Sequence, residues 1–131
     1  MKVLHLPRNP ANVAWNISRA QRKLGYVSDL MVLESKKLNI GYDYNFHLEQ
    51  YPLLLKYLIG GIKLTPFLMN AIRNYDIFHI HYKQILPFQL DTILFKKFNK
   101  KVIFHFHGCD IRLNCPHPSC QKNKWEKSNA N

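Results

Sequence analysis

Short apolar runs alternate along the chain with segments in which apolar residues recur at helical spacing. The apolar runs have the length of buried β-strands and cover residues 2–6, 28–33, 76–81 and 101–106. The helical spacing covers residues 13–24, 48–74 and 88–98. Strands that alternate with helices predict an α/β domain, in which a Rossmann-like parallel sheet carries helices on both faces.

Local signals refine the ends of these segments. Asn12 is a candidate N-cap of the first helix, and Gly25 stands where a left-handed residue commonly ends a helix. The pair Gly60-Gly61 and Pro66 predict a break within the second helical segment. Residues 36–47 are expected to be irregular.

The predicted fold also indicates where ligands bind. In a parallel sheet with right-handed crossovers, the carboxyl ends of the strands lie along one edge, and ligands bind beside that edge. The loops that follow predicted strands there are residues 7–12, 82–87 and 107–112. We expect these loops to carry the function.

Composition limits the function classes. A chain of 131 residues with 47% hydrophobic residues suits one globular domain. The first apolar run is too short for a signal peptide, so a reducing cytoplasm is the expected compartment for the three cysteines, Cys109, Cys115 and Cys120.

The formal net charge of +11 indicates an acidic partner, and nucleic acid, anionic membrane and phosphorylated substrate all fit charge alone. Neither an aromatic and basic RNA-binding motif nor zinc-finger spacing is present, which argues against specific nucleic-acid recognition.

The longest apolar stretch, residues 51–72, is interrupted by Lys56, Lys63 and Pro66. It falls short of the roughly 20 uninterrupted apolar residues that a membrane span requires. We expect buried or half-buried helices here. The alternative is a basic, aromatic surface that rests peripherally on anionic lipid at the inner face of the membrane.

Two His-x-His pairs, His79 with His81 and His105 with His107, lie at the ends of predicted strands. Residues two apart on a strand share one face, so each pair can converge on one site. His79 and His105 lie deeper in their strands and are expected to be core histidines. His81 and His107 are the better candidates for contact with a ligand.

A metal site is the main alternative for these histidines. Asp110 follows the second pair, and further candidate zinc ligands stand downstream: Cys115, His117 and Cys120. Their Cys-x-His-x2-Cys spacing matches no standard structural zinc pattern, and mixed thiolate and imidazole ligands suit a hydrolytic dinuclear centre poorly. We therefore predict no metal.

The loop of residues 7–12 occupies the position where Rossmann-type folds hold phosphate, but it lacks the Gly-x-Gly-x-x-Gly fingerprint. A helix N-terminus can still bind an anion through its free N–H groups. Arg8 would add a guanidinium group suited to bidentate phosphate contact.

An ordered set of motifs resembles glycosyltransferase family 4, whose members have the GT-B fold. The motifs are KVLHLPRNPANVAWNISRAQRKLGYVSDLMV, then YDIFHIH, then KKVIFHFHGCDIR. In the family, a strand, a loop and a helix reading roughly ARALRKLGHEVD precede DIVHVH and VVxTxHGxD. The corresponding residues here are Ala20, Leu24, Gly25 and Asp29, and the resemblance covers about residues 1–113.

This resemblance implies that residues 1–113 form the acceptor-side N-terminal half of a GT-B fold. It implies a retaining enzyme that moves a sugar from a nucleotide sugar to a glycan, a lipid-linked acceptor or a small acceptor. His107 matches the family histidine beside the transferred sugar and is the candidate catalytic residue. The candidate substrate-binding residues are Arg8, Asn9, Asn12, His81, Gly108, Asp110 and Arg112. No cofactor is implied, because such enzymes usually need no metal.

The sequence departs from the family pattern in three ways. PRNPAN replaces the usual glycine pair of the first loop, and Cys109 stands where serine or threonine is more common. Residues 114–131 form a polar tail that we expect to be the start of a truncated continuation. The C-terminal domain that would bind most of the nucleotide sugar is missing, so the chain alone is expected to be inactive.

Two other functions stay open at this point. One is a metal-dependent hydrolase that uses the two His-x-His pairs. The other is a non-catalytic module that pairs with a separately encoded C-terminal half.

Overall fold

The computed structural model describes residues 1–35, 41–82, 85–86 and 90–106. Within these residues, the strands form one five-stranded sheet in the order β3-β2-β1-β4-β5, and every pair of neighbours is parallel. The strands are β1 (Lys2–Leu6), β2 (Val27–Val32), β3 (Tyr44–Asn45), β4 (Ile77–His81) and β5 (Lys101–His105). The helices are α1 (Val13–Lys23), α2 (Leu53–Asn74) and α3 (Leu90–Lys97), with short 3-10 turns at Pro10–Asn12 and Leu48–Gln50. The chain is therefore an α/β, Rossmann-like domain, as the alternation of apolar runs predicted.

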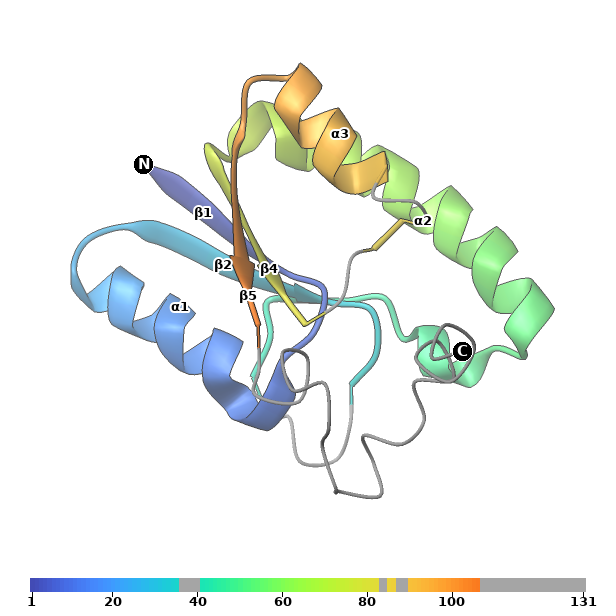
Figure 1. Cartoon of the computed structure of the whole chain (residues 1–131). Coiled ribbons are helices and arrows are strands. Elements are labelled where there is room, and N and C mark those ends of the chain that lie inside the picture. The colour runs from blue at the N-terminus through green and yellow to red at the C-terminus, as the bar shows by residue number, and fades with distance from the viewer. Residues whose placement is uncertain (36–40, 83–84, 87–89, 107–131) are drawn as a thin grey trace, which may run out of the picture.

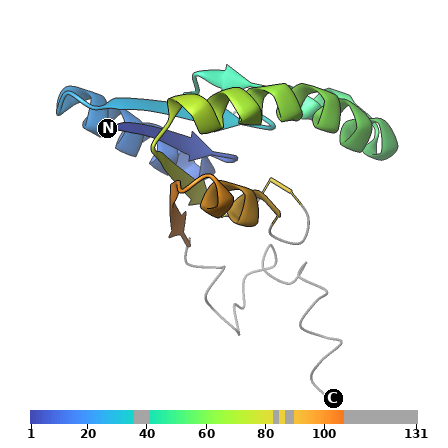
Figure 2. The same ribbon diagram turned by 90° about the horizontal axis from the view of Figure 1, so that it is seen from above.

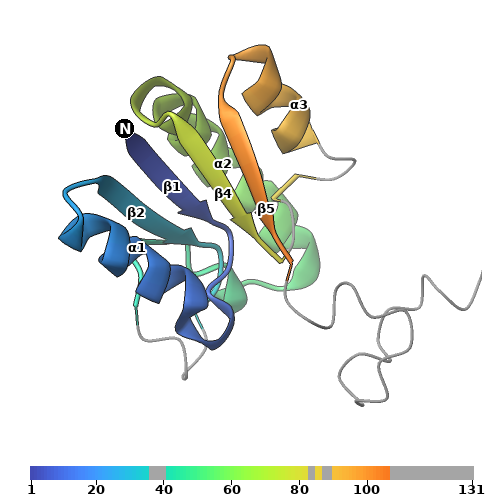
Figure 3. The same cartoon turned by 60° about the vertical axis from the view of Figure 1, so that its left-hand side comes forward.

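Helices cover both faces of the sheet (Figures 1 and 3). On one face, Ala14 and Trp15 of α1 pack against Leu30 and Val32 of β2. On the other face, α2 and α3 cover the larger core, in which Phe78 of β4 stacks on Phe95 of α3 with ring centroids 3.9 Å apart. The other buried members of this core are Leu4, Leu6, Met31, Leu64, Leu68, Ala71, Ile72, Tyr75 and Ile80.

The predicted strands agree with the observed ones to within a residue at each end, but the predicted irregular segment contains β3. This two-residue strand pairs with Met31 and Val32 at the end of β2. Its pattern is too short to show a period, so no signal in the sequence separated it from a loop.

The predicted break in the second helical segment, near Gly60-Gly61 or Pro66, is wrong. The segment opens with the 3-10 turn at Leu48–Gln50, and α2 then runs as one helix through Pro66 (Figure 2). An interior proline costs about 3 kcal/mol in a helix. Leu64, Leu68 and Ile72 are all buried on the sheet, and each such side chain contributes about 1.5–3 kcal/mol. Burial on both sides of Pro66 therefore outweighs the lost backbone bond.

The ends of α1 confirm one prediction and correct another. Gly25 has a φ of +84°, the left-handed conformation that was predicted after the helix. Asn12 occupies the N-cap position, but its side chain makes no capping hydrogen bond. Asn9 supplies that bond instead, because its Oδ1 accepts from the backbone N–H of Trp15 at 3.2 Å.

Candidate functional site

The order of the strands reverses between β1 and β4, which lie side by side although α1, β2, β3 and α2 separate them in the chain. In open α/β sheets, ligands bind beside the carboxyl ends of the strands at such a reversal. The loop of residues 7–12 leaves β1 at this point, and Tyr82 leaves β4. The guanidinium carbon of Arg8 lies 5.5 Å from the centre of the Tyr82 ring, within the range of a cation–π contact. Two loops that were predicted to meet at this edge are therefore in contact.

Asn9 holds the first of these loops in shape. Its side chain is 2% exposed, and its Nδ2 donates to Asn12 Oδ1 at 3.1 Å and to the carbonyl oxygen of Gly41 at 3.0 Å. Both polar atoms of the Asn9 amide are thus engaged within the protein. This residue was predicted to bind substrate, and the geometry gives it a different contact set: it fixes the loop that carries Arg8.

Glycine is required at position 41 because the chain passes against Trp15. A Cβ atom built on Gly41 would lie 2.2 Å from the indole ring, far inside any allowed contact. The close approach brings the Gly41 carbonyl to Asn9. Ala11 and Asn12 complete the loop in left-handed conformations, with φ of 48° and 59°.

Four histidines of the described chain lie together on the face of the sheet that carries α1. His5 of β1 is in register with His79 of β4, and His81 of β4 is in register with His105 of β5. The ring centroids of neighbouring members are 4.2 to 5.6 Å apart. We call these four residues the histidine cluster.

Burial within the histidine cluster differs from the sequence prediction. His81, predicted to contact a ligand, is fully buried together with His5, whereas His79 and His105, predicted to be core residues, are half-buried. Depth along a strand was a poor guide, because β4 is an inner strand and the rings of His5, His79 and His105 surround His81.

A chain of hydrogen bonds fixes the tautomers of the buried pair. The amide oxygen of Gln21, on α1, accepts from Ser28 Oγ at 2.7 Å and lies 2.9 Å from His5 Nε2. An amide oxygen can only accept, so His5 Nε2 carries a hydrogen and His5 Nδ1 has the lone pair. That Nδ1 lies 3.0 Å from His81 Nε2, which is therefore the donor. Burial is the main cause that lowers the pKa of His5, and it keeps this imidazole neutral.

The remaining predicted site residues divide into two groups. Arg8, Asn9, Asn12 and His81 lie in or beside the loops at the carboxyl ends of β1 and β4. His107, Gly108, Asp110 and Arg112 lie outside the described residues. Sequence reasoning missed His5 and Gln21. A lone histidine in an apolar run carries no signal until the strand order sets it opposite His79.

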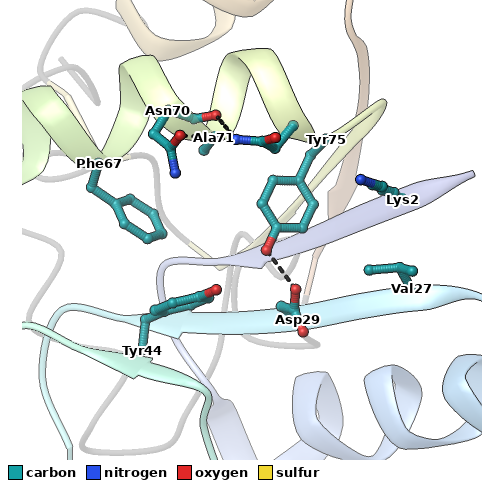
Figure 4. Close-up of a pocket in the computed structure, with 9 residues that line it drawn as sticks. Lys2, Val27, Asp29, Tyr44, Phe67, Asn70, Ala71 and Tyr75 are labelled. Carbon is teal, nitrogen blue, oxygen red and sulfur yellow. Dashed lines mark hydrogen bonds between the residues drawn. The ribbon is translucent and has the colours of Figure 1, made fainter.

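A pocket of about 340 Å³ lies on the face of the sheet opposite the histidine cluster, between α2 and the β2–β3 side of the sheet (Figure 4). Tyr75 donates its hydroxyl hydrogen to Asp29 in this pocket, and burial is the main cause that raises the pKa of Tyr75. Asp29 also accepts from Arg22 at 3.0 Å. The Asp29 carboxylate of this pocket already has protein partners, which makes the pocket a weaker candidate than the edge where Arg8 meets Tyr82.

In the described part of the chain, no helix combines the length and the apolar character that crossing a membrane requires. Comparisons with protein-family models, with curated proteins and with solved structures found no match.

Proposed function

We propose that this chain is the acceptor-side half of a retaining glycosyltransferase that uses a nucleotide sugar as donor. The acceptor is a glycan, a lipid-linked sugar or a small molecule. One observation carries the proposal: the loops after β1 and β4 meet at the reversal of strand order, through Arg8 and Tyr82. This is the position where the motifs that resemble glycosyltransferase family 4 would have to converge.

The chemistry of this edge suits a phosphorylated sugar. Arg8 is half-buried, and the loop that carries it is held by the Asn9 hydrogen bonds, so its guanidinium group is partly ordered before a ligand arrives. A guanidinium group can bind two phosphate oxygens at once. The net charge of +11 attracts an anionic substrate toward the whole surface.

Catalysis would require a second α/β domain, because GT-B enzymes work in the cleft between two domains. In this arrangement His107 would lie beside the transferred sugar, with Asp110 and Arg112 orienting the acceptor. The chain alone would bind ligand without turning it over. Peripheral contact with anionic lipid through the exposed residues Tyr57, Leu58 and Lys63 of α2 is compatible with a lipid-linked acceptor.

The test is a sugar-transfer assay with a panel of UDP- and GDP-sugars. The chain is assayed alone and together with a C-terminal α/β domain encoded beside it. We expect no transfer by the chain alone and transfer by the pair. Turnover by the chain alone would refute the two-domain requirement.

Variants of the pair locate the site. A charge-assisted hydrogen bond contributes about 1.5–3 kcal/mol, so Arg8→Ala should lower transfer about 10- to 150-fold. Arg19→Ala is the matched control, because Arg19 also lies over an aromatic ring, that of Trp15 at 5.9 Å, but on α1 away from the edge. Equal activity of the two variants would exclude the proposed edge.

A further inference from the structure

The histidine cluster contains a set of nitrogen ligands that the sequence analysis did not consider. His5, His79 and His81 each offer one ring nitrogen, and these three nitrogens all lie within 4.8 Å of one another. The prediction of no metal weighed His79, His81 and the downstream cysteines, but not His5. The strand register adds His5 to the set, because it lies opposite His79 on the neighbouring strand.

We propose that His5, His79 and His81 bind a divalent first-row metal ion of the Zn²⁺ class. Imidazole nitrogen is a preferred ligand of Zn²⁺, Ni²⁺ and Cu²⁺, whereas Mg²⁺ and Ca²⁺ prefer oxygen. All three ligands are neutral in the form that binds metal, and no thiolate is required. This metal-binding proposal does not rest on the proposed sugar transfer.

The spacing of the nitrogens is close to what such an ion needs. Zn–N bonds of about 2.0–2.1 Å at tetrahedral angles place neighbouring nitrogens about 3.3 Å apart. His5 Nδ1 and His81 Nε2 are 3.0 Å apart, and the ion would take the place of the hydrogen between them. That hydrogen would move to His81 Nδ1, which keeps the His81 imidazole neutral. Rotation of the His79 ring would be required to bring the third nitrogen closer, because the three nitrogens lie within 4.8 Å of one another rather than at the spacing of bound ligands.

The surroundings orient the ligands. Gln21 accepts from His5 Nε2, which leaves Nδ1 as the binding atom, and metal-bound histidines usually have such a partner on the other ring nitrogen. Gln21 is itself held by Ser28 Oγ. Burial lowers the pKa of His5, which favours the neutral ligand over the imidazolium ion.

We expect an ion to enter from the β5 side. His79 and His105 are half-buried at this rim, and the His105 ring lies 5.0 Å from that of His81. Three protein ligands leave a fourth position for water or for His105. The ion would join β1 to β4 at the reversal of strand order.

The experiment titrates the full chain, purified free of metal, with Zn²⁺ and with Mg²⁺ by isothermal calorimetry. Cys109, Cys115 and Cys120 could bind zinc elsewhere, so a variant with all three changed to serine serves as the reference protein. We expect this reference to bind one Zn²⁺ and no Mg²⁺. With Co²⁺, we expect weak bands of nitrogen and oxygen ligands without the intense charge-transfer bands of thiolates.

Three substitutions in the reference protein test the ligands. His79→Gln should weaken binding at least tenfold, and Gln21→Ala should weaken it about 10- to 100-fold through loss of orientation. His47→Gln is the matched control, since His47 is an exposed histidine outside the cluster and should bind zinc unchanged. Circular dichroism checks that each variant is folded.

Side-chain ¹H–¹⁵N spectra of histidine give a second measurement that needs no ligand variant. Zn²⁺ should shift the ring nitrogens of His5, His79 and His81 and leave those of His47 in place. No binding by the reference protein, or equal binding by His79→Gln and His47→Gln, would overturn the proposal. In those cases the histidine cluster is a packed, hydrogen-bonded core.

Discussion

Asn9→Ala tests whether the loop after β1 depends on one buried amide. The substitution removes three hydrogen bonds, to the Trp15 N–H, the Gly41 carbonyl and Asn12 Oδ1. A protein hydrogen bond contributes about 0.5–1.5 kcal/mol net, so the free energy of unfolding should fall by about 1.5–4.5 kcal/mol. For a domain with a typical stability of about 5–15 kcal/mol, this is a large fraction.

Urea denaturation followed by circular dichroism measures the change. Asn16→Ala is the matched control, because Asn16 is exposed on α1 and its loss should change stability by less than about 0.5 kcal/mol. An Asn9→Ala variant that is destabilised no more than this control would refute the role given to the amide. The loop conformation would then be held by backbone preferences alone.

Asn9→Asp distinguishes the contribution of the hydrogen bond that caps α1 from that of the hydrogen bond to Gly41. A carboxylate keeps the oxygen that accepts from the Trp15 N–H, but it places a second acceptor 3.0 Å from the Gly41 carbonyl oxygen. A buried charge facing a carbonyl is unfavourable, and protonation of the carboxyl group would restore a donor. The deficit relative to the natural chain should therefore shrink as the pH falls from 7 to 4, and a pH-independent deficit would contradict the assigned contacts.

Further measurements address the core, the glycine at position 41 and the histidine cluster. Phe95→Ala removes a fully buried ring stacked on Phe78 and should lower the free energy of unfolding by about 3–5 kcal/mol in urea denaturation; a loss under about 1 kcal/mol would contradict this packing. Gly41→Ala should destabilise the domain and abolish the hydrogen bond between Asn9 and the Gly41 carbonyl, and altered Trp15 fluorescence would report the change. Gly61→Ala is the control, because an added Cβ there meets no atom within 4 Å, and it should be neutral or stabilising. In EDTA, stability should fall as the pH drops below about 6.5, by up to about 1.4 kcal/mol per pH unit, because the lowered pKa of His5 means that the unfolded chain binds the proton first. The rings of His79, His81 and His105 face His5 or its neighbours, and the charged groups of Arg22, Asp29 and Asp43 lie nearby. The substitution His5→Gln should reduce the pH dependence of stability by up to about 1.4 kcal/mol per pH unit, which corresponds to one proton. An unchanged pH dependence would show that His5 is not responsible.

Local pattern was enough to predict the elements that bury whole side chains. The apolar runs that became β1, β2 and β4 were visible because each of these strands has consecutive buried residues. The run that became β5 was visible from its apolar residues, although none of its residues is fully buried. The prediction of one ligand edge followed from parallel pairing alone, and the contact of Arg8 with Tyr82 lies at that edge. These four strands therefore needed no information beyond the local pattern, whereas β3 and the continuity of α2 did.

Features that depend on two distant segments could not be predicted in this way. The capping hydrogen bond of α1 comes from Asn9 rather than Asn12, because the Asn9 amide is held in place by its hydrogen bond to the carbonyl oxygen of Gly41, which is distant in the sequence. The helix continues through Pro66 because the sheet buries the residues around it. The burial of His81 and the role of His5 follow from the neighbours of β4, which the sequence leaves open until the strand order is known.

The loop after Leu6 and the histidine cluster share β1, but they can be tested separately. His5 lies within the strand on the α1 face, whereas Arg8 lies beyond its end, over Tyr82. In one outcome, His79→Gln loses zinc binding while sugar transfer still depends on Arg8. The metal would then serve only to link β1 to β4. Loss of both would indicate that the ion also positions the edge where Arg8 meets Tyr82. The coupling would then run through the backbone of β1, since that strand leads directly into the loop.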